Sequence, residues 1–122
     1  MIYYKELSEK IIGMAIEVHK ELGNGFLEKV YENALMFELK QNQTKADQQV
    51  PIPVLYKGRV VGEYFADILV DNKIILELKT IKRIDPIHEA QLIHYLKATE
   101  LKLGFLLNFA AQGQLEFKRL VN

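Results

Sequence analysis

The stretch Phe65–Lys82, FADILVDNKIILELKTIK, decides the fold, and the rest of the chain is arranged around it. It predicts two apolar strands joined by a turn at residues 71–73. Three charged residues interrupt these strands: Asp67, Glu77 and Lys79. Alternate residues of a strand share a face, so Glu77 and Lys79 point the same way. Charged groups among Ile, Leu and Val are costly to bury unless they are paired, hydrogen-bonded or metal-bound, which marks a candidate site.

The length of the turn decides whether the two acids share a face. Residues directly opposite each other in an antiparallel pair lie on the same face. A two-residue loop would pair Glu77 with Ala66 and leave Asp67 on the wrong face. A three-residue loop, Asp71-Asn72-Lys73, pairs Asp67 with Glu77, and such loops accept a left-handed residue such as Asn. We therefore predict the three-residue loop, or a bulge with the same effect.

The remaining residues predict the element order ααβββαββ. Apolar residues at spacings of three and four predict helices over residues 5–22 and 26–41, with Gly23-Asn24-Gly25 between them. The second helix is expected to bury Leu27, Val30, Tyr31, Ala34, Leu35 and Leu39. Residues 41–49 are polar and predict a loop. Strands are predicted over residues 50–57, 60–70, 74–81, 103–109 and 115–121, and a third helix over residues 86–99.

Local signals refine this outline. Pro51 and Pro53 cannot donate to a ladder, so their strand is expected at an edge of the sheet or beside a bulge. Asp85 is a suitable N-cap for a helix that starts at Pro86. Residues 60–70 and 74–81 are apolar on both faces, apart from the three charged residues. We therefore expect a mixed central sheet that helices cover on both sides.

Composition narrows the class of protein. The chain has 122 residues, 49% hydrophobic and 26% charged, which fits one globular domain over residues 1–122. No apolar run reaches the length of a membrane span, and the charged N-terminal residues show no signal peptide, so a cytoplasmic location is expected. The absence of cysteine excludes thiolate metal sites within this chain. The net charge of zero argues against strong non-specific binding of nucleic acid, although a local basic patch remains compatible with it.

Several separated motifs carry a family resemblance. The spacing Asp67-x9-Glu77-x-Lys79 resembles the core motif of the PD-(D/E)XK nuclease superfamily, and the order ααβββαββ is similar to the core arrangement of its α/β fold. Gly25-Phe-Leu-Glu28-Lys-Val-Tyr31 resembles the motif of the GxxExxY family of small bacterial proteins in that superfamily. Gln91 and Tyr95 form a QxxxY pattern that resembles RecB-type exonucleases. The resemblance implies the fold and a nuclease ancestry.

The resemblance also implies a metal site. Hydrolysis of a phosphodiester needs a divalent cation, and Mg²⁺ or Mn²⁺ takes hard oxygen ligands. Asp67 and Glu77 would be those ligands, with the backbone carbonyl of Leu78 as a third. Lys79 would orient the attacking water and offset developing negative charge. The alternative for Lys79 is a cross-strand ion pair with one of the acids.

Further residues take roles from the same resemblance. Glu28 would bind a second metal ion or hold a metal-bound water, or else it is a solvated glutamate near a helix start. His19 occupies the place of a metal-binding histidine on an upstream helix, or else it is a satisfied structural imidazole. Glu32 lies one helical turn after Glu28 and is a weaker candidate. Gln91 is expected to be catalytic and Tyr95 to bind substrate.

The other candidates would contact substrate. His88 lies one turn from Gln91 and could face the cleft. Lys82 and Arg83 follow the catalytic strand and could meet phosphates, or else they form a solvated face. His94 is expected to be structural and Tyr31 to serve in packing.

The sequence therefore predicts a divalent-metal-dependent nuclease, with DNA favoured over RNA as substrate. The alternative is a non-catalytic subunit that binds nucleic acid or a partner protein and keeps the nuclease fold. Small chains of this fold often need a homodimer or a partner protein to complete a substrate groove. No membrane partner is expected.

Overall fold

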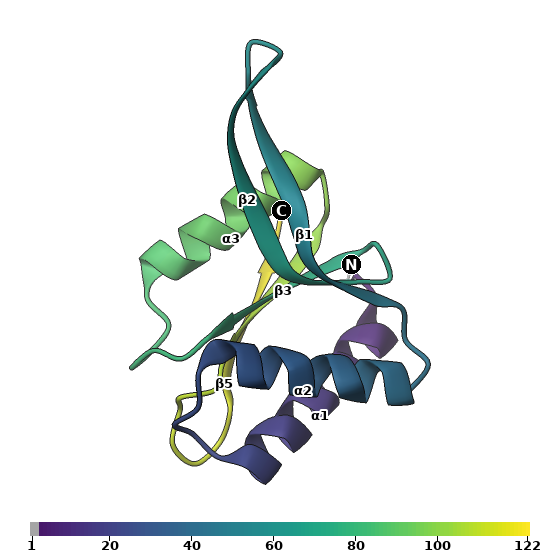
Figure 1. The fold of residues 1–122 in the computed structure, drawn as a ribbon, viewed down its shortest axis with the longest axis vertical. Coiled ribbons are helices and arrows are strands. Elements are labelled where there is room, and N and C mark those ends of the chain that lie inside the picture. Colours follow the sequence, from purple (N-terminus) through teal and green to yellow (C-terminus); the bar gives the residue numbers. More distant parts are fainter. Residues whose placement is uncertain (1–2) are drawn as a thin grey trace.

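The computed structural model describes residues 3–122, which form a five-stranded sheet with two helices on one face and one on the other (Figure 1). The helices are α1 (Lys5–Leu22), α2 (Glu28–Gln41) and α3 (Pro86–Thr99). The strands are β1 (Ala46–Tyr56), β2 (Arg59–Val70), β3 (Ile74–Lys79), β4 (Leu103–Asn108) and β5 (Glu116–Val121). This order confirms the predicted ααβββαββ arrangement. Within residues 3–122, no helix has the length and hydropathy needed to cross a membrane.

The sheet is mixed, as predicted. Its strands follow chain order from β1 to β5, so β1 and β5 are the two edges. β3 and β4 are parallel, whereas the other neighbours are antiparallel. Helix α3 supplies the crossover that a parallel pair requires. The edge position of β1 explains how this strand accommodates Pro51 and Pro53. One side of an edge strand has no neighbour, so a proline there does not remove a hydrogen bond of the sheet.

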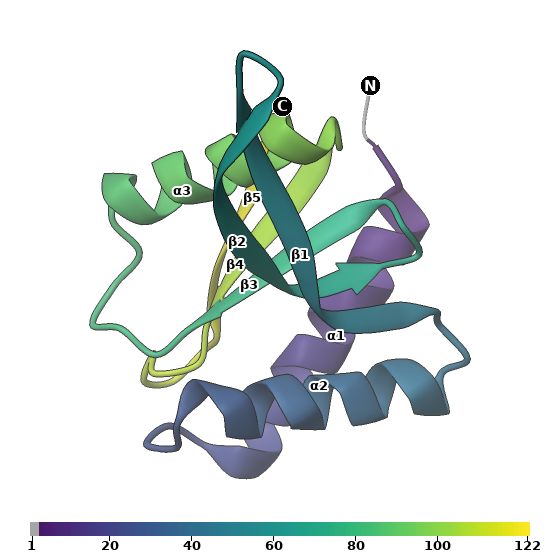
Figure 2. The ribbon, with the colours of Figure 1, turned by 45° about the horizontal axis from the view of Figure 1, so that its top comes forward.

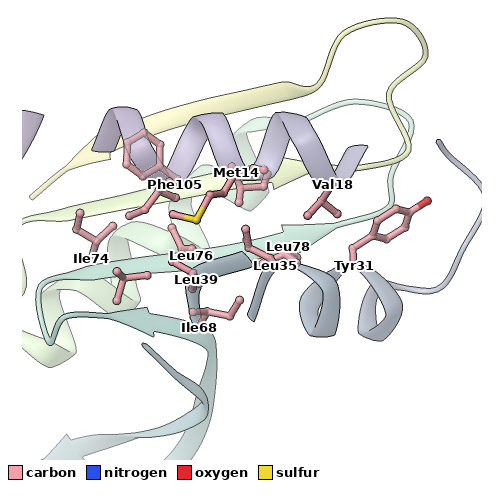
Figure 3. Packing of buried hydrophobic residues seen from close by; sticks show 14 of the residues in the cluster. Met14, Val18, Tyr31, Leu35, Leu39, Ile68, Ile74, Leu76, Leu78 and Phe105 are labelled. Carbon is pink, nitrogen blue, oxygen red and sulfur yellow. The ribbon is translucent and has the colours of Figure 1, made fainter. Parts of the chain in front are cut away.

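Two apolar clusters lie on opposite faces of the sheet. One joins α1 and α2 to residues of β2, β3 and β4, and Figure 3 labels ten of its members: Met14, Val18, Tyr31, Leu35, Leu39, Ile68, Ile74, Leu76, Leu78 and Phe105. The other packs α3 against the opposite face through Leu92, Leu96, Ile75 and Leu106. Leu76 and Leu78 therefore face α1 and α2, while Ile75 faces α3. By strand alternation, Glu77 and Lys79 share the α3 side with Ile75.

Three expectations were wrong in part. Only the second half of β2 is covered, because the β1–β2 hairpin projects beyond the helices (Figure 2) and leaves Val60 and Val61 64% and 63% exposed. Residues 46–49 extend β1, where an edge strand tolerates polar side chains, instead of belonging to a loop. Leu27 is 80% exposed because it is the N-cap of α2, and Val30 is also exposed.

Gly104 in β4 sets the distance between α3 and the sheet. A Cβ at this position would lie 2.9 Å from Leu92 Cδ1 and 3.2 Å from the Ile75 carbonyl oxygen. We expect Gly104→Ala to lower the free energy of unfolding by about 1–3 kcal/mol, because the backbone contact cannot yield without moving the strand. Urea unfolding measures this effect. Gly62→Ala is the control, since nothing lies within 4 Å of a Cβ there, and equal losses in both variants would contradict the packing argument.

Candidate functional site

The central hairpin has the predicted three-residue loop. β2 and β3 pair through Val70 with Ile74, Leu69 with Ile75, and Ile68 with Leu76. Within the loop, Asp71 and Asn72 adopt left-handed φ angles of 51° and 55°. Beyond Ile68 the two strands separate, and β2 continues alongside β1 (Figure 2). The separation opens the sheet at the next pair of residues, Asp67 and Glu77.

Asp67 and Glu77, which we call the acidic pair, bridge the point where the strands separate. The Asp67 backbone N–H donates to Glu77 Oε2 at 2.8 Å, and the Leu78 N–H donates to Asp67 Oδ2 at 2.9 Å. Each carboxylate thus bonds to the backbone of the opposite strand. Leu69 and Ile75, two residues away from each acid, both belong to the cluster under α3. The two acids therefore share a sheet face, as the loop length predicts.

The Leu78 carbonyl faces the same opening. In a strand, the N–H and C=O of one residue point to the same neighbouring strand, and the next residue points to the other. The Lys79 carbonyl accepts a hydrogen bond from the Phe109 N–H at 2.9 Å, on the β4 side. The Leu78 N–H points the other way, toward Asp67. The carbonyl oxygen of Leu78 is therefore directed toward the acidic pair.

Burial perturbs both acids. Glu77 is only 4% exposed, and this desolvation, with the nearby charge of Asp67, raises the pKa of Glu77 to about 8. Desolvation also raises the pKa of Asp67, and the charge of Glu32 adds to the rise. Two carboxyl groups this close cannot both ionise cheaply. A divalent cation between them would relieve that repulsion, and the hard oxygen donors of this site suit Mg²⁺ or Mn²⁺.

Glu77 should make the stability of the metal-free protein depend on pH. Its pKa rises from the ordinary 4.5 to about 8 on folding, so the folded state binds more protons between these values. The stabilisation from protonated Glu77 is complete below pH 4.5 and is lost as pH rises through 8, with a slope of up to about 1.4 kcal/mol per pH unit. Glu77→Gln should flatten this decline. Urea unfolding with EDTA across this range checks it, and parallel curves for both proteins would contradict the assignment.

Helix α3 carries Gln91, which contacts Lys79, and Tyr95 one turn later. Lys79 Nζ donates to Gln91 Oε1 at 3.2 Å, so two residues to which the resemblance gives catalytic roles are in contact. Among residues 3–122, no ion pair within 4.0 Å joins Lys79 to either acid, so the cross-strand alternative has no support here. Tyr95 is buried, and burial with the charge of Glu77 raises the pKa of its phenol to about 12. The phenol therefore stays protonated near neutral pH and can donate.

Glu28 reaches the end of β3 from the start of α2. Its Oε2 accepts from the Thr80 N–H at 3.2 Å and from the Thr80 hydroxyl at 3.5 Å. This contact lies one residue beyond Lys79. Glu28 is exposed, and its carboxylate is engaged with Thr80 rather than with Asp67 or Glu77.

Tyr31 fixes the position of Glu28. Its hydroxyl donates to the Gly23 carbonyl at 2.7 Å and accepts from the Phe26 N–H at 3.2 Å, which closes the loop before α2. Its ring stacks on Phe109 with centroids 4.8 Å apart. Since the Phe109 N–H binds the Lys79 carbonyl, Tyr31 ties the start of α2 to the end of β3. It therefore serves in packing.

A third carboxylate, that of the buried Glu32, is linked to Asp67 through a glutamine side chain. Glu32 is 4% exposed, and its two oxygens accept from Gln48 at 2.6 Å and Gln49 at 3.0 Å. Gln49 also donates to Asp67 Oδ1 at 3.4 Å, so one amide links both acids. Gln49 has a left-handed φ of 51° and falls between the paired residues opposite Asp67. The sequence predicts a loop for these glutamines and therefore gives them no role beside Asp67. The run of polar residues before Val50 was the one sequence feature that could have indicated it.

Asn108 and Glu116 hold the loop after Lys79. Asn108 is fully buried at the end of β4 and donates to the Ile81 carbonyl at 2.9 Å and to Glu116 Oε1 at 2.8 Å. Glu116 also accepts from the Ile84 N–H at 3.2 Å. Sequence reasoning missed both residues. An Asn closing the apolar run LGFLLN was the only sign of the network.

The structure does not bring His19 to the acidic pair. Its Nε2 is hydrogen-bonded to the Ala111 carbonyl at 2.8 Å, and the ring is buried beside Phe109. Across residues 3–122, no group of three or more His, Asp or Glu side chains has an arrangement that could hold a metal ion. His19 and Glu28 therefore do not converge with Asp67 and Glu77. The expected histidine ligand is instead a satisfied structural imidazole.

The remaining candidates lie around the start of α3. His88 Nδ1 accepts the Asp85 backbone N–H at 2.9 Å, so this imidazole caps α3, with Asp85 as N-cap and Pro86 as the predicted first residue. Lys82 and Arg83 are exposed on the preceding loop, and Arg83 pairs with Asp85 at 3.2 Å. Lys82 remains available at this surface.

Comparison with known proteins identifies the family. A family model described as the PD-(D/E)XK nuclease superfamily matches residues 5–120. The chain belongs to this superfamily. Nucleases of the PD-(D/E)XK superfamily generally use divalent metal ions and act on nucleic acid. Membership of the narrower GxxExxY family stays a prediction.

A solved structure supports the fold. The protein of the "Crystal structure of SSO0001" superposes with a TM-score of 0.58 at 22% sequence identity. The match covers 77% of this chain and 49% of that chain, so the matched region is about half of the SSO0001 chain. This likeness concerns the fold alone. No curated protein matches the chain significantly.

Proposed function

We propose that this member of the PD-(D/E)XK superfamily is a divalent-metal-dependent nuclease that hydrolyses phosphodiester bonds, with DNA favoured over RNA. The acidic pair carries the proposal. Its two carboxylates have raised pKa values, and they lie beside Lys79 where the sheet opens. A structural role alone would not require two adjoining acids that destabilise each other.

The chain's own oxygens would hold the cation. Asp67, Glu77 and the carbonyl of Leu78 would bind Mg²⁺ or Mn²⁺, which keeps several waters and needs few protein ligands. A bound divalent ion supplies polarisation of the phosphate and a lowered pKa for a coordinated water. Deprotonated Glu77 is the form that binds metal, so its raised pKa favours binding at alkaline pH.

Lys79 and its neighbours position the reactants. Gln91 accepts from the Lys79 ammonium and restricts its direction. Lys79 would then orient the attacking water and offset negative charge as it develops on the phosphate. Tyr95 can donate a hydrogen bond beside Glu77. Lys82, exposed after the catalytic strand, would bind a phosphate outside the reacting centre.

Glu28 could assist the reaction in two ways. In the arrangement observed, it holds the backbone of Thr80 and so fixes the end of the strand that carries Lys79. It would also accept a hydrogen bond from a water at the edge of the acidic pair. Either role makes Glu28 a supporting residue.

One observation favours the non-catalytic alternative. Within residues 3–122, no third acidic or histidine side chain is placed to share a metal ion with the acidic pair. A subunit that binds nucleic acid or a partner protein would tolerate such an incomplete ligand set. Two carboxylates and a carbonyl nevertheless suffice for Mg²⁺, because water completes its coordination.

A cleavage assay tests the proposal. Labelled single- and double-stranded DNA and RNA are incubated with the protein and Mg²⁺, Mn²⁺ or EDTA. We expect cleavage with either metal and none with EDTA. Binding of nucleic acid without cleavage under any metal condition would favour the non-catalytic alternative.

A further inference from the structure

Residues of β1, β2 and α3 line a groove whose member Gln91 contacts Lys79. Its volume is about 400 Å³. We call it the aromatic groove and define it by six of its lining residues: Ile52, Tyr64, Ile87, Gln91, His94 and Tyr95. Neither the family match nor the fold comparison assigns it a role.

Gln91 connects the aromatic groove to the residues of the proposed catalytic centre. Gln91 lines the groove and at the same time accepts the hydrogen bond from Lys79 at 3.2 Å. Tyr95, one helical turn after Gln91 on α3, also lines it. A ligand group in the groove would therefore be a direct neighbour of a phosphate held at the acidic pair.

The groove walls suit a flat, unsaturated ring. Tyr64 is 51% exposed, and its ring lies 5.5 Å from that of Tyr95, tilted by 42°. Ile87 is 74% exposed and adds apolar surface at the rim. Gln91 and His94 supply hydrogen-bonding groups at the edges. Apolar walls with a few polar groups are typical of sites for small planar ligands of this volume.

The state of the nucleic acid decides whether the groove can be used. In a duplex, the faces of the bases are stacked inside, and the outer surface presents phosphates and base edges. A duplex would thus leave the exposed ring of Tyr64 without a partner. An unpaired base offers both faces, and base stacking on aromatic side chains contributes to affinity regardless of the base identity.

We infer that the aromatic groove binds an unpaired nucleobase next to the scissile phosphate, so that the substrate class is single-stranded nucleic acid or a duplex end with unpaired nucleotides. This inference rests on the proposed nuclease function. A base in the aromatic groove would itself cover apolar surface of the β1–β2 hairpin, without a second copy of the chain. Pro51 and Pro53 lie within the edge strand β1, and prolines on an edge discourage its pairing with another strand.

Fluorescence of 2-aminopurine tests the inference directly. A short single-stranded DNA that contains this base is titrated with the full chain in EDTA, which prevents cleavage. The same strand annealed to its complement serves for comparison. We expect quenching and tighter binding for the single strand. Tyr64→Ala should weaken single-strand binding by about tenfold, while Tyr64→Phe should retain it.

Tyr56→Ala is the matched control, because Tyr56 is an exposed aromatic residue of the same hairpin and does not line the groove. Equal affinity for single strand and duplex, or equal effects of Tyr64→Ala and Tyr56→Ala, would overturn the inference. The metal-dependent cleavage assay reports separately on the nuclease function. Cleavage of duplex and single strand at equal rates would overturn the groove assignment and leave the nuclease standing.

Discussion

Glu77→Ala is expected to reduce metal-dependent cleavage by about a thousandfold or more. A divalent ion contributes several kcal/mol of transition-state stabilisation, and each ~1.4 kcal/mol corresponds to a factor of ten in rate. Asp67→Asn should have a comparable effect, because it removes the second carboxylate of the acidic pair. Cleavage of labelled single-stranded DNA in Mn²⁺ measures both variants.

The same substitution should not weaken the metal-free fold. Glu77 is buried with a raised pKa, so its removal relieves both desolvation and repulsion from Asp67. The hydrogen bond from the Asp67 N–H is lost, which offsets part of this gain. Glu17→Ala on the exposed face of α1 is the control. If Glu77→Ala cleaves as fast as the control, the acidic pair does not form the catalytic centre.

Lys79→Ala should separate catalysis from metal binding. We expect cleavage to fall by about 10²–10³, which is typical for loss of one group that stabilises transition-state charge. Binding of Mn²⁺ should persist or tighten, because a positive charge beside the cation is removed. Lys40→Ala at the end of α2 serves as the control for the general loss of a lysine. Cleavage and thermal melts with and without Mn²⁺ are the measurements.

The ion-pair alternative predicts a different result for Lys79→Ala. Removing one partner of a buried pair leaves an uncompensated charge and destabilises a fold by about 3–5 kcal/mol. Metal would then change the melting temperature of neither the wild type nor the variant. A large loss of stability without any metal response would therefore contradict the role proposed for Lys79.

The acidic pair could be predicted from sequence because its geometry depends on local rules. Strand alternation and the length of one loop are sufficient to place Asp67 and Glu77 on one face. The family resemblance gives Gln91 and Lys79 roles in one site, and their hydrogen bond agrees with it. All of these residues lie on strands and a helix whose apolar residues recur with a clear period in the sequence.

Other features depend on long-range packing that no local pattern encodes. The divergence of β2 from β3 and the left-handed Gln49 together allow one amide to join Glu32 to Asp67. Asn108 finds Glu116 only after β4 and β5 have paired. His19 was assigned by resemblance, but the segment after β4 supplies the Ala111 carbonyl that engages its ring. The sequence offers many possible hydrogen-bond partners for each of these polar side chains, and the folded chain selects one or two of them.

Calorimetric titration of the full chain with Mn²⁺, at a pH above 8 where Glu77 is deprotonated, tests the central claim most directly. The account predicts saturable binding by the wild type, retained binding by Lys79→Ala, and loss of that binding in Glu77→Ala. Absence of binding by the wild type, or unchanged binding by Glu77→Ala, would contradict the claim that Asp67 and Glu77 form the metal site.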